Sequence, residues 1–362
     1  MGNSLGKIFK ITNFGESHGN CMGIVVDGCP AGLPITEADI QQEVERRRPG
    51  AAGTTERWES DKVEIISGIY GGNTTGAPIC MLSWNKDIDS GVYKKNRFGL
   101  RPGHADYTAF VKYGGFNDFR GGGRFSGRIT LAYVMAGAIA KKLIGRLGID
   151  VFAHVVEIGG IKAHAQELAV IKKNASGNPL WCADPEAADK MTRLIEQVKQ
   201  EKDSLGGIIE GIAINLPAGL GEPVFDNFDG ELSRALFAIP AVRGVEFGAG
   251  FAVAGMKGSQ NNDLYEIEDG RIVTRTNNAG GVLGGISTGM PVVVRVAVKP
   301  TASIARSQET VDIQKMTRTS LEVAGRHDTC IVPRAVPGVE AMMAVTICDF
   351  VLQAGLIPRV LS

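Results

Sequence analysis

Three of the five histidines lie in short segments that combine glycine with Ser, Arg or Asp. His18 lies in GESHG, His104 in RPGHAD and His327 in GRHD. Because the ordinary imidazole pKa is about 6.5, histidine can give and take a proton near neutral pH. One turn histidine needs no functional explanation, but three in glycine turns predict a site that moves protons. His154 and His164 lie outside such segments, and we expect them to satisfy structural hydrogen bonds.

Arginines gather in the same glycine-containing segments. The planar guanidinium binds phosphate and carboxylate groups through two donors at once. Compensation of a helix dipole would explain the arginines of RRRPG, but it would explain no other segment. In RGGGRFSGR (120–128), three successive glycines precede a helix and predict an anion cradle of backbone N–H groups. The arginines in or beside these turns are Arg48, Arg101, Arg124, Arg128 and Arg326.

The common nucleotide and hydrolase fingerprints are absent from the sequence. GGGRFSG is not G-x-G-x-x-G, and GFAVAGMKGS has Met256 where a P-loop needs lysine after the glycine. No G-x-S-x-G elbow occurs, and Ser17 beside His18 does not form a hydrolytic triad because adjacent side chains diverge. No His and carboxylate cluster has metal-ligand spacing. The pattern favours a site for a multiply anionic small molecule, with histidines as proton donors.

The overall composition excludes several other classes of protein. Lys and Arg number 39, as do Asp and Glu, so no net field attracts nucleic acid or an anionic membrane. We expect a cytoplasmic protein, because no secretion signal is visible and no segment approaches about 20 apolar residues. The six cysteines lack C-x-x-C spacing and are expected to be structural. The 48 glycines indicate many tight turns.

The sequence predicts an α+β fold. Residues 36–50 are predicted to form a helix, which begins at a capping box of Thr36 and Asp39. Another helix is predicted from about Arg128 to Leu147. Runs rich in β-branched residues predict strands. Since helices and strands do not alternate strictly, we expect mostly antiparallel sheets over central helices. No linker or repeat divides the chain, which indicates one domain over residues 1–362. Further helices are expected at 185–203 and 336–353, and strands at 62–70, 150–160, 207–217 and 291–300.

The ordered set of motifs resembles chorismate synthases from Gly6 to about Asp349. The matching segments are GESHG, RRRPG, RPGHADYT, RGGGRFSGR-x-T, AGLGEPVFD, NNAGGVLGGISTG, KPT-x-S and GRHD-x-C-x-x-P-R-A-V-P. The resemblance implies a homotetramer of single-domain β-α-β sandwiches. It also implies a 1,4-elimination of phosphate and a ring proton from 5-enolpyruvylshikimate 3-phosphate to give chorismate. Reduced FMN would be required without net redox change.

The resemblance assigns roles to individual residues. His18 would protonate the departing phosphate, and His104 would protonate or neutralise the reduced flavin. Asp328, with Ser17 and Ser126 as relays, would help to move the substrate proton. The substrate would be held by Arg48, Arg101 and Arg128. The cofactor would be held by Arg124, Phe125, Ser126, Pro240, Ala241, Gly284, Lys299, Pro300, Thr301, Ala302, Ser303 and Arg326.

The chain departs from the family pattern near the cofactor. Phe125 stands where the family has Ser or Ala, and Ile129 stands where it has Glu. Pro240, Ala302 and Thr329 also differ from the usual Asn, Ser and Pro. These differences predict a reshaped pocket or a weaker hold on the flavin.

Two other functions stay open on the sequence alone. A flavin site would suit a flavin reductase or oxidoreductase, although the many arginines disfavour it. A catalytically silent anion-binding paralogue is the other alternative, which the intact His18, His104 and Asp328 disfavour. The sequence leaves open whether the chain reduces its own flavin with NAD(P)H.

Overall fold

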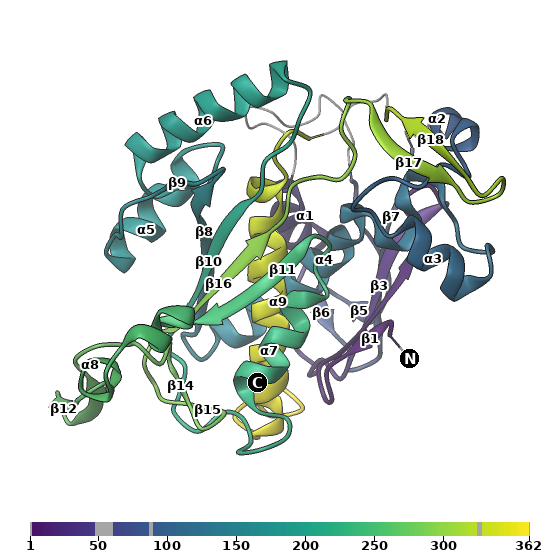
Figure 1. Ribbon diagram of the computed structural model, residues 1–362. Coiled ribbons are helices and arrows are strands. Elements are labelled where there is room, and N and C mark those ends of the chain that lie inside the picture. The colour runs from purple at the N-terminus through teal and green to yellow at the C-terminus, as the bar shows by residue number, and fades with distance from the viewer. Residues whose placement is uncertain (1, 48–60, 87–89, 324–327, 362) are drawn as a thin grey trace.

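Two five-stranded antiparallel sheets enclose a layer of helices (Figure 1). The computed structural model describes residues 2–47, 61–86, 90–323 and 328–361. The first sheet has the order β1 (Ser4–Leu5), β2 (Lys10–Gly15), β3 (Cys21–Asp27), β7 (Ile79–Trp84), β4 (Glu64–Ser67). The second has the order β11 (Val242–Phe247), β16 (Val292–Val298), β10 (Gly207–Ile214), β8 (Asp150–Ile158), β9 (Ile161–Lys162).

Each sheet turns one face to the helices. In β16, Val292, Val294, Val296 and Val298 are buried while the residues between them are partly exposed. Side chains of a strand alternate between its two faces, so these four valines lie on the same face of β16, the face that packs on the helices. The strands expected at 62–70, 150–160, 207–217 and 291–300 are confirmed.

Two long apolar helices form the centre. Helix α4 (Thr130–Gly145) contacts β2, β3 and β7 of the first sheet and also β8, whereas α9 (Val332–Gln353) contacts β8 and β10. The two helices also pack on each other. A Cβ added to Gly137 would lie 2.4 Å from Cβ of Ala341, so glycine is required where the helices approach most closely. Helices α1 (Glu37–Glu45) and α7 (Phe228–Phe237) pack beside them. The expected α+β class with central helices is confirmed.

The predicted helices are present with small shifts at their ends. In α1, the Thr36 side chain accepts from the backbone of Asp39, and the reciprocal bond completes a capping box. Helix α4 begins at Thr130 because the 3₁₀ turn η2 (Gly127–Ile129) precedes it. Helix α6 (Pro185–Gln200) begins after the cap Asp184. Helix α9 begins four residues earlier than predicted, since it accommodates Pro337 in its interior.

Helix α9 corrects one sequence expectation. We expected no segment near the length of a membrane span, yet α9 is long and apolar enough to cross a membrane by composition alone. Nearly all of it is buried inside the protein. It therefore has the properties of a core helix that is covered by protein on every side.

The remaining elements lie around this sandwich. Helices α2 (Gly91–Lys95) and α3 (Asp106–Tyr113) lie near the first sheet, and α5 (Leu168–Asn174) lies near β8 (Figure 1). The other elements are α8 (Gly258–Asn261), β5 (Ile69–Tyr70), β6 (Asn73–Thr74), β12 (Tyr265–Glu268), β13 (Arg271–Thr274), β14 (Val282–Leu283), β15 (Ile286–Ser287), β17 (Gln308–Asp312), β18 (Thr317–Leu321), η1 (Arg120–Phe125), η3 (Ala175–Gly177) and η4 (Gly250–Gly255).

The cap of α6 makes stability depend on pH. The backbone N–H groups of His164 and Ala187 and the His164 side chain bind the Asp184 carboxylate and lower its pKa to about 2. This carboxylate stabilises the fold above the unfolded value of about 3.9, and the contribution is lost as the pH falls towards the folded value. We expect Asp184→Asn to be less stable than the wild type at pH 6 in urea unfolding. That difference should shrink between about pH 4 and pH 2; a difference independent of pH would contradict the assignment.

Candidate active site

A cleft of about 990 Å³ collects most of the sequence-predicted residues. Its walls come from the β2–β3 turn, the loop before α3, η1 and η2, the α7–β11 turn, the segment after β16 and the start of α9. The predicted residues that line it are Ser17, His18, Arg101, His104, Arg124, Phe125, Ser126, Arg128, Pro240, Ala241, Lys299, Pro300, Thr301, Ala302, Ser303 and Asp328.

The other three predicted residues fall into two groups. Arg48 and Arg326 lie outside the described residues. Gly284 lies between β14 and β15, and it does not line the cleft. The two histidines that we expect to be structural lie elsewhere: His154 is 3.1 Å from Glu210, and His164 is 2.7 Å from Asp184.

His18 is fixed on three sides. It lies in the tight turn between β2 and β3 and is only 5% exposed. Its Nδ1 lies 2.9 Å from Oγ of Ser90, and the Tyr93 ring meets it edge-on with ring centres 5.2 Å apart. The N–H of Ser17 donates to the carbonyl of Gly123 at 3.3 Å, which joins this turn to η1. A histidine held in this way presents one ring edge reproducibly.

The three glycines of η1 lie against both histidines. Gly121, Gly122 and Gly123 all have positive φ, at 57°, 82° and 50°. A Cβ on Gly121 would lie 2.4 Å from Nε2 of His18, and a Cβ on Gly122 would lie 3.1 Å from Nε2 of His104. Both imidazoles therefore approach a single backbone turn, which only glycine permits.

The anion cradle expected from these glycines is not formed by all three N–H groups. The N–H of Gly122 already donates to the carbonyl of Phe119 at 3.3 Å. The carbonyl of Gly123 accepts from the N–H groups of Ser17 and Ser126. In the described structure, the turn brings the two histidines together, and side chains supply the positive charge.

Adding one methyl group to this turn should damage the site. We expect Gly121→Ala to lower kcat at least about 10-fold, because the new Cβ would displace the His18 ring. Gly148→Ala is the matched control: Gly148 also has positive φ, at 76°, but has open space around its Cβ position. Both variants carry similar backbone strain, of about 1–2 kcal/mol. Steady-state turnover and thermal unfolding should be measured for both, and equal kcat values would exclude the steric role of Gly121.

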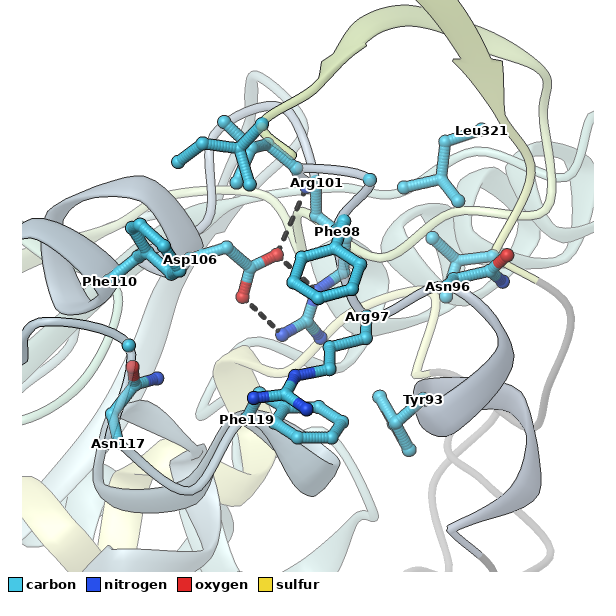
Figure 2. Close-up of a pocket in the computed structure, with 15 residues that line it drawn as sticks. Tyr93, Asn96, Arg97, Phe98, Arg101, Asp106, Phe110, Asn117, Phe119 and Leu321 are labelled. Carbon is cyan, nitrogen blue, oxygen red and sulfur yellow. Dashed lines mark hydrogen bonds and ion pairs between the residues drawn. The ribbon is translucent and has the colours of Figure 1, made fainter. Parts of the chain in front are cut away.

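Asp106 binds both motif residues of the RPGHAD loop. Its carboxylate accepts from Nε of Arg101 at 2.8 Å and from Nη2 at 2.7 Å, as Figure 2 shows. Nδ1 of His104 lies 2.7 Å from the same carboxylate. Nη1 of Arg101 also lies 3.4 Å from Oγ of Ser303. Since a guanidinium has five N–H donors, Arg101 keeps donors for a ligand.

A second chain of contacts ties Arg128 to the His18 turn. Nε of Arg128 donates to Oδ1 of Asn85 at 2.7 Å, and Nη2 donates to Asp61 at 2.9 Å. The Asn85 amide donates to the carbonyls of Glu16 and Gly19, on either side of His18. Asn85 therefore fixes the proposed substrate arginine relative to the histidine.

One side of the cleft has positive charge that is poorly compensated. Arg47 is 5% exposed, its Nε has no hydrogen-bond partner among the described residues, and Asp61 is 4.0 Å away. Burial, with the nearby Arg334 charge, lowers the pKa of Arg47 to about 10. Arg334 itself donates to Asp328 at 2.6 Å. An anion bound here would stabilise these groups.

The segment after β16 forms another cationic wall. Nζ of Lys299 donates to the carbonyl of Gly103 at 3.0 Å, and burial and the charge of Arg243 lower its pKa. Ala241 has φ of 74°, which is unusual for a residue other than glycine, and its carbonyl accepts from the N–H of Lys299. Such strained positions gather at functional sites.

Positive charge dominates the cleft as a whole. Seven basic side chains and two carboxylates stand among its described lining residues: Arg47, Arg101, Arg124, Arg128, Arg243, Lys299 and Arg334 against Asp61 and Asp328. Not all of them are equally available, because the Arg124 guanidinium donates to Asn3, Asn13 and Gly15. The excess suits a ligand that carries several negative charges.

A smaller pocket of about 50 Å³ adjoins the cleft (Figure 2). The two share Tyr93 and Arg101. In the small pocket, the Arg97 guanidinium lies 5.0 Å from the centre of the Phe119 ring and 5.2 Å from that of Phe98. The apolar residues of this pocket lie beside the ion pair between Arg101 and Asp106.

Sequence reasoning missed several residues of the site. Asp106 and Arg334 stand within quoted motifs, RPGHADYT and P-R-A-V-P, but received no role. Arg47 lies in RRRPG, where compensation of a helix dipole already explains an arginine. Ser90 and Asn85 carry no sequence signal, because their importance comes from contacts with distant segments.

Comparison with known proteins gives one consistent result. The family model for chorismate synthase matches residues 9–352. The chain belongs to the chorismate synthase family. A chorismate synthase of Dehalococcoides mccartyi strain BAV1 is 59% identical over all of both chains. One from Methanocella arvoryzae is 52% identical over 98% of this chain and 96% of its own.

A solved structure agrees with the sequence matches. A crystal structure of chorismate synthase superposes with a TM-score of 0.75 at 30% identity, covering 96% of this chain and 93% of the other. The family that the motifs indicated is thus confirmed, and with it membership among lyases that eliminate phosphate. The reductase and silent-paralogue alternatives are not favoured.

Proposed function

We propose that this protein converts 5-enolpyruvylshikimate 3-phosphate into chorismate and phosphate. The observation that carries the proposal is the placement of His18 and His104 against one glycine turn in a strongly cationic cleft. The substrate has a phosphate and two carboxylates, so it needs several guanidinium partners. The elimination breaks one C–O and one C–H bond of the ring and forms one C=C bond, without net oxidation.

The arginines and His18 act on the leaving group. Arg101 and Arg128 hold the anionic substrate, and we extend that role to Arg48 on the resemblance alone. Phosphate leaves more readily when it is protonated, and His18 is positioned to donate that proton. Its Nδ1 lies beside Ser90, and we assign Nε2, on the ring edge beside Gly121, to the phosphate.

Reduced FMN fits the wall formed by Lys299, Ala241 and their neighbours. Burial, with the charge of Arg243, lowers the pKa of Lys299, and a flavin phosphate or an anionic ring beside it would favour the charged ammonium. When bound, reduced FMN supplies electron density to the substrate as phosphate departs. Phe125 and Ile129 both line the cleft, but Phe125 is 36% exposed whereas Ile129 is buried. Phe125 therefore shapes the pocket more directly than Ile129.

Asp328 is assigned to movement of the ring proton, with Ser17 and Ser126 as hydrogen-bonding relays. All three line the cleft. Ser17 is 4% exposed and lies in the same turn as His18. The Ser126 side chain accepts from the N–H of Arg128 at 3.3 Å. This contact links the relay to a substrate-binding arginine.

We further propose a cytoplasmic homotetramer. Large apolar side chains on the β12–β13 hairpin are mostly exposed, with Tyr265 at 67%, Ile267 at 79% and Ile272 at 72%. Exposed apolar groups that gather in this way are typical of subunit contacts. Light scattering would test the mass of the assembly.

An anaerobic incubation tests the activity. Substrate and chemically reduced FMN should yield chorismate and phosphate in equal amounts. Phosphate without chorismate would indicate simple hydrolysis and contradict the proposal. Steady consumption of NADPH without substrate would instead support a flavin reductase.

A further inference from the structure

The Asp106 carboxylate joins an arginine and a histidine of the cleft. Asp106 is the first residue of α3, and its side chain is 19% exposed. It accepts from the backbone N–H, Nε and Nη2 of Arg101 at 3.0, 2.8 and 2.7 Å. Nδ1 of His104 approaches Oδ1 at 2.7 Å. The carboxylate thus has two partners in the cleft wall.

These partners keep Asp106 ionised. Burial by itself would raise its pKa, but the hydrogen bonds from Arg101 and His104 outweigh burial and hold the pKa of Asp106 well below its usual range. The carboxylate is therefore an acceptor at every pH at which an enzyme of this kind works.

The ionised Asp106 carboxylate determines which ring nitrogen of His104 carries a proton. Two lone pairs do not approach to 2.7 Å without a proton between them, so Nδ1 must carry it. Nη2 of Arg101 has two N–H groups and donates to the same carboxylate, but it lies farther from Nδ1, at 3.2 Å, so the shorter contact with the carboxylate decides the assignment. The second ring nitrogen, Nε2, faces the glycine turn near Gly122.

We propose that Asp106 is the positioning residue of His104, holding the proton on Nδ1 so that Nε2 faces the cleft. This inference deepens the proposed function, because the work of His104 rests on it. A carboxylate opposite one ring nitrogen fixes the tautomer and orientation of an imidazole and stabilises its protonated form. Nε2 can then exchange a proton with a ligand without rotation of the ring.

Nitrogen NMR of the cofactor-free protein tests the tautomer directly. Uniform ¹⁵N labelling of histidine resolves the ring nitrogens, and His104→Asn identifies the His104 signals. We expect Nδ1 to carry a proton at every pH measured, including about pH 8.5. An unprotonated Nδ1 in the wild type would overturn the inference without any variant.

The chain offers a matched control pair. His164 and Asp184 repeat the same Nδ1 to carboxylate distance of 2.7 Å, but outside the cleft. Asp184→Asn should disturb the signal of His164 and leave kcat unchanged. Asp106→Asn should disturb the signal of His104 and lower kcat by roughly 10- to 100-fold with a smaller change in KM.

The outcomes separate this inference from the proposed function. Asp106→Glu, which keeps the charge, should recover part of kcat, and thermal unfolding should show that each variant is folded. An unchanged kcat in Asp106→Asn, or a loss confined to KM, would overturn the positioning role. If the wild type forms no chorismate, the proposed function fails, while the nitrogen signals still decide the position of the proton.

Discussion

His18→Ala is expected to lower kcat by roughly 10²–10⁴-fold, the range for loss of one positioned acid. The ring lies against Gly121, and Ser90 and Tyr93 fix its orientation. Water replacing the ring would be neither as acidic as an imidazolium nor held in place. KM should change much less, because the arginines bind the substrate anions. Anaerobic single-turnover measurement of phosphate release checks the step itself.

A control variant shows whether a lower kcat comes from loss of the proton donor or from a general disturbance of the fold. His164→Ala removes a histidine whose side chain is 77% exposed and lies outside the cleft, so kcat should stay within about twofold of the wild type. Thermal unfolding should confirm that His18→Ala is folded. Phosphate release at the wild-type rate in that variant would remove His18 from the mechanism.

The largest effect on stability is expected at Glu340. This residue of α9 is 1% exposed, and its carboxylate accepts from Arg46 at 2.5 and 2.8 Å and from Lys141 at 2.5 Å. The N–H of Ala153 also donates to it at 3.0 Å. Burial alone would raise the pKa of Glu340, but Lys141 and Arg46 lower it. The network joins α1, α4, β8 and α9 in the core.

We expect Glu340→Ala to lower the free energy of unfolding by roughly 3–5 kcal/mol, because it leaves two partly buried cations without this carboxylate. Glu340→Gln should cost less, since the amide oxygen can still accept. The control Glu231→Ala breaks an ion pair with Arg234, whose side chain is 59% exposed, and should cost no more than about 1 kcal/mol. Urea unfolding at fixed protein concentration measures all three. Equal losses in Glu340→Ala and the control would contradict the network's importance.

The sequence predicted the fold best where patterns are local. The valines of β16 alternate in the chain as they do in the sheet, and the capping residues Thr36 and Asp184 stand directly before their helices. The first sheet was harder to foresee. Strands β2 and β3 contain buried Asn13 and the close-packed Gly23, so their runs look less like strands. The start of α9 was missed because Pro337 usually marks a boundary.

In the site, too, local patterns could be predicted and contacts between distant segments could not. Motif residues such as His18, His104 and Arg128 could be predicted because their types and glycine neighbours are visible in the sequence. Their partners could not. Ser90 reaches His18 across 72 positions, and Asn85 reaches Arg128 across 43. The charge balance of the cleft likewise depends on which arginines the fold brings together, as the burial of Arg47 beside Arg334 shows.

A crystal structure with bound 5-enolpyruvylshikimate 3-phosphate and FMN tests the central claim most directly. The account predicts both molecules in the one cleft, with a phosphate oxygen about 2.6–3.2 Å from Nε2 of His18 and the flavin ring beside His104. Basic side chains, Arg101 and Arg128 among them, should contact the substrate anions. Substrate bound elsewhere, with both imidazoles remote from it and from the flavin, would contradict the account.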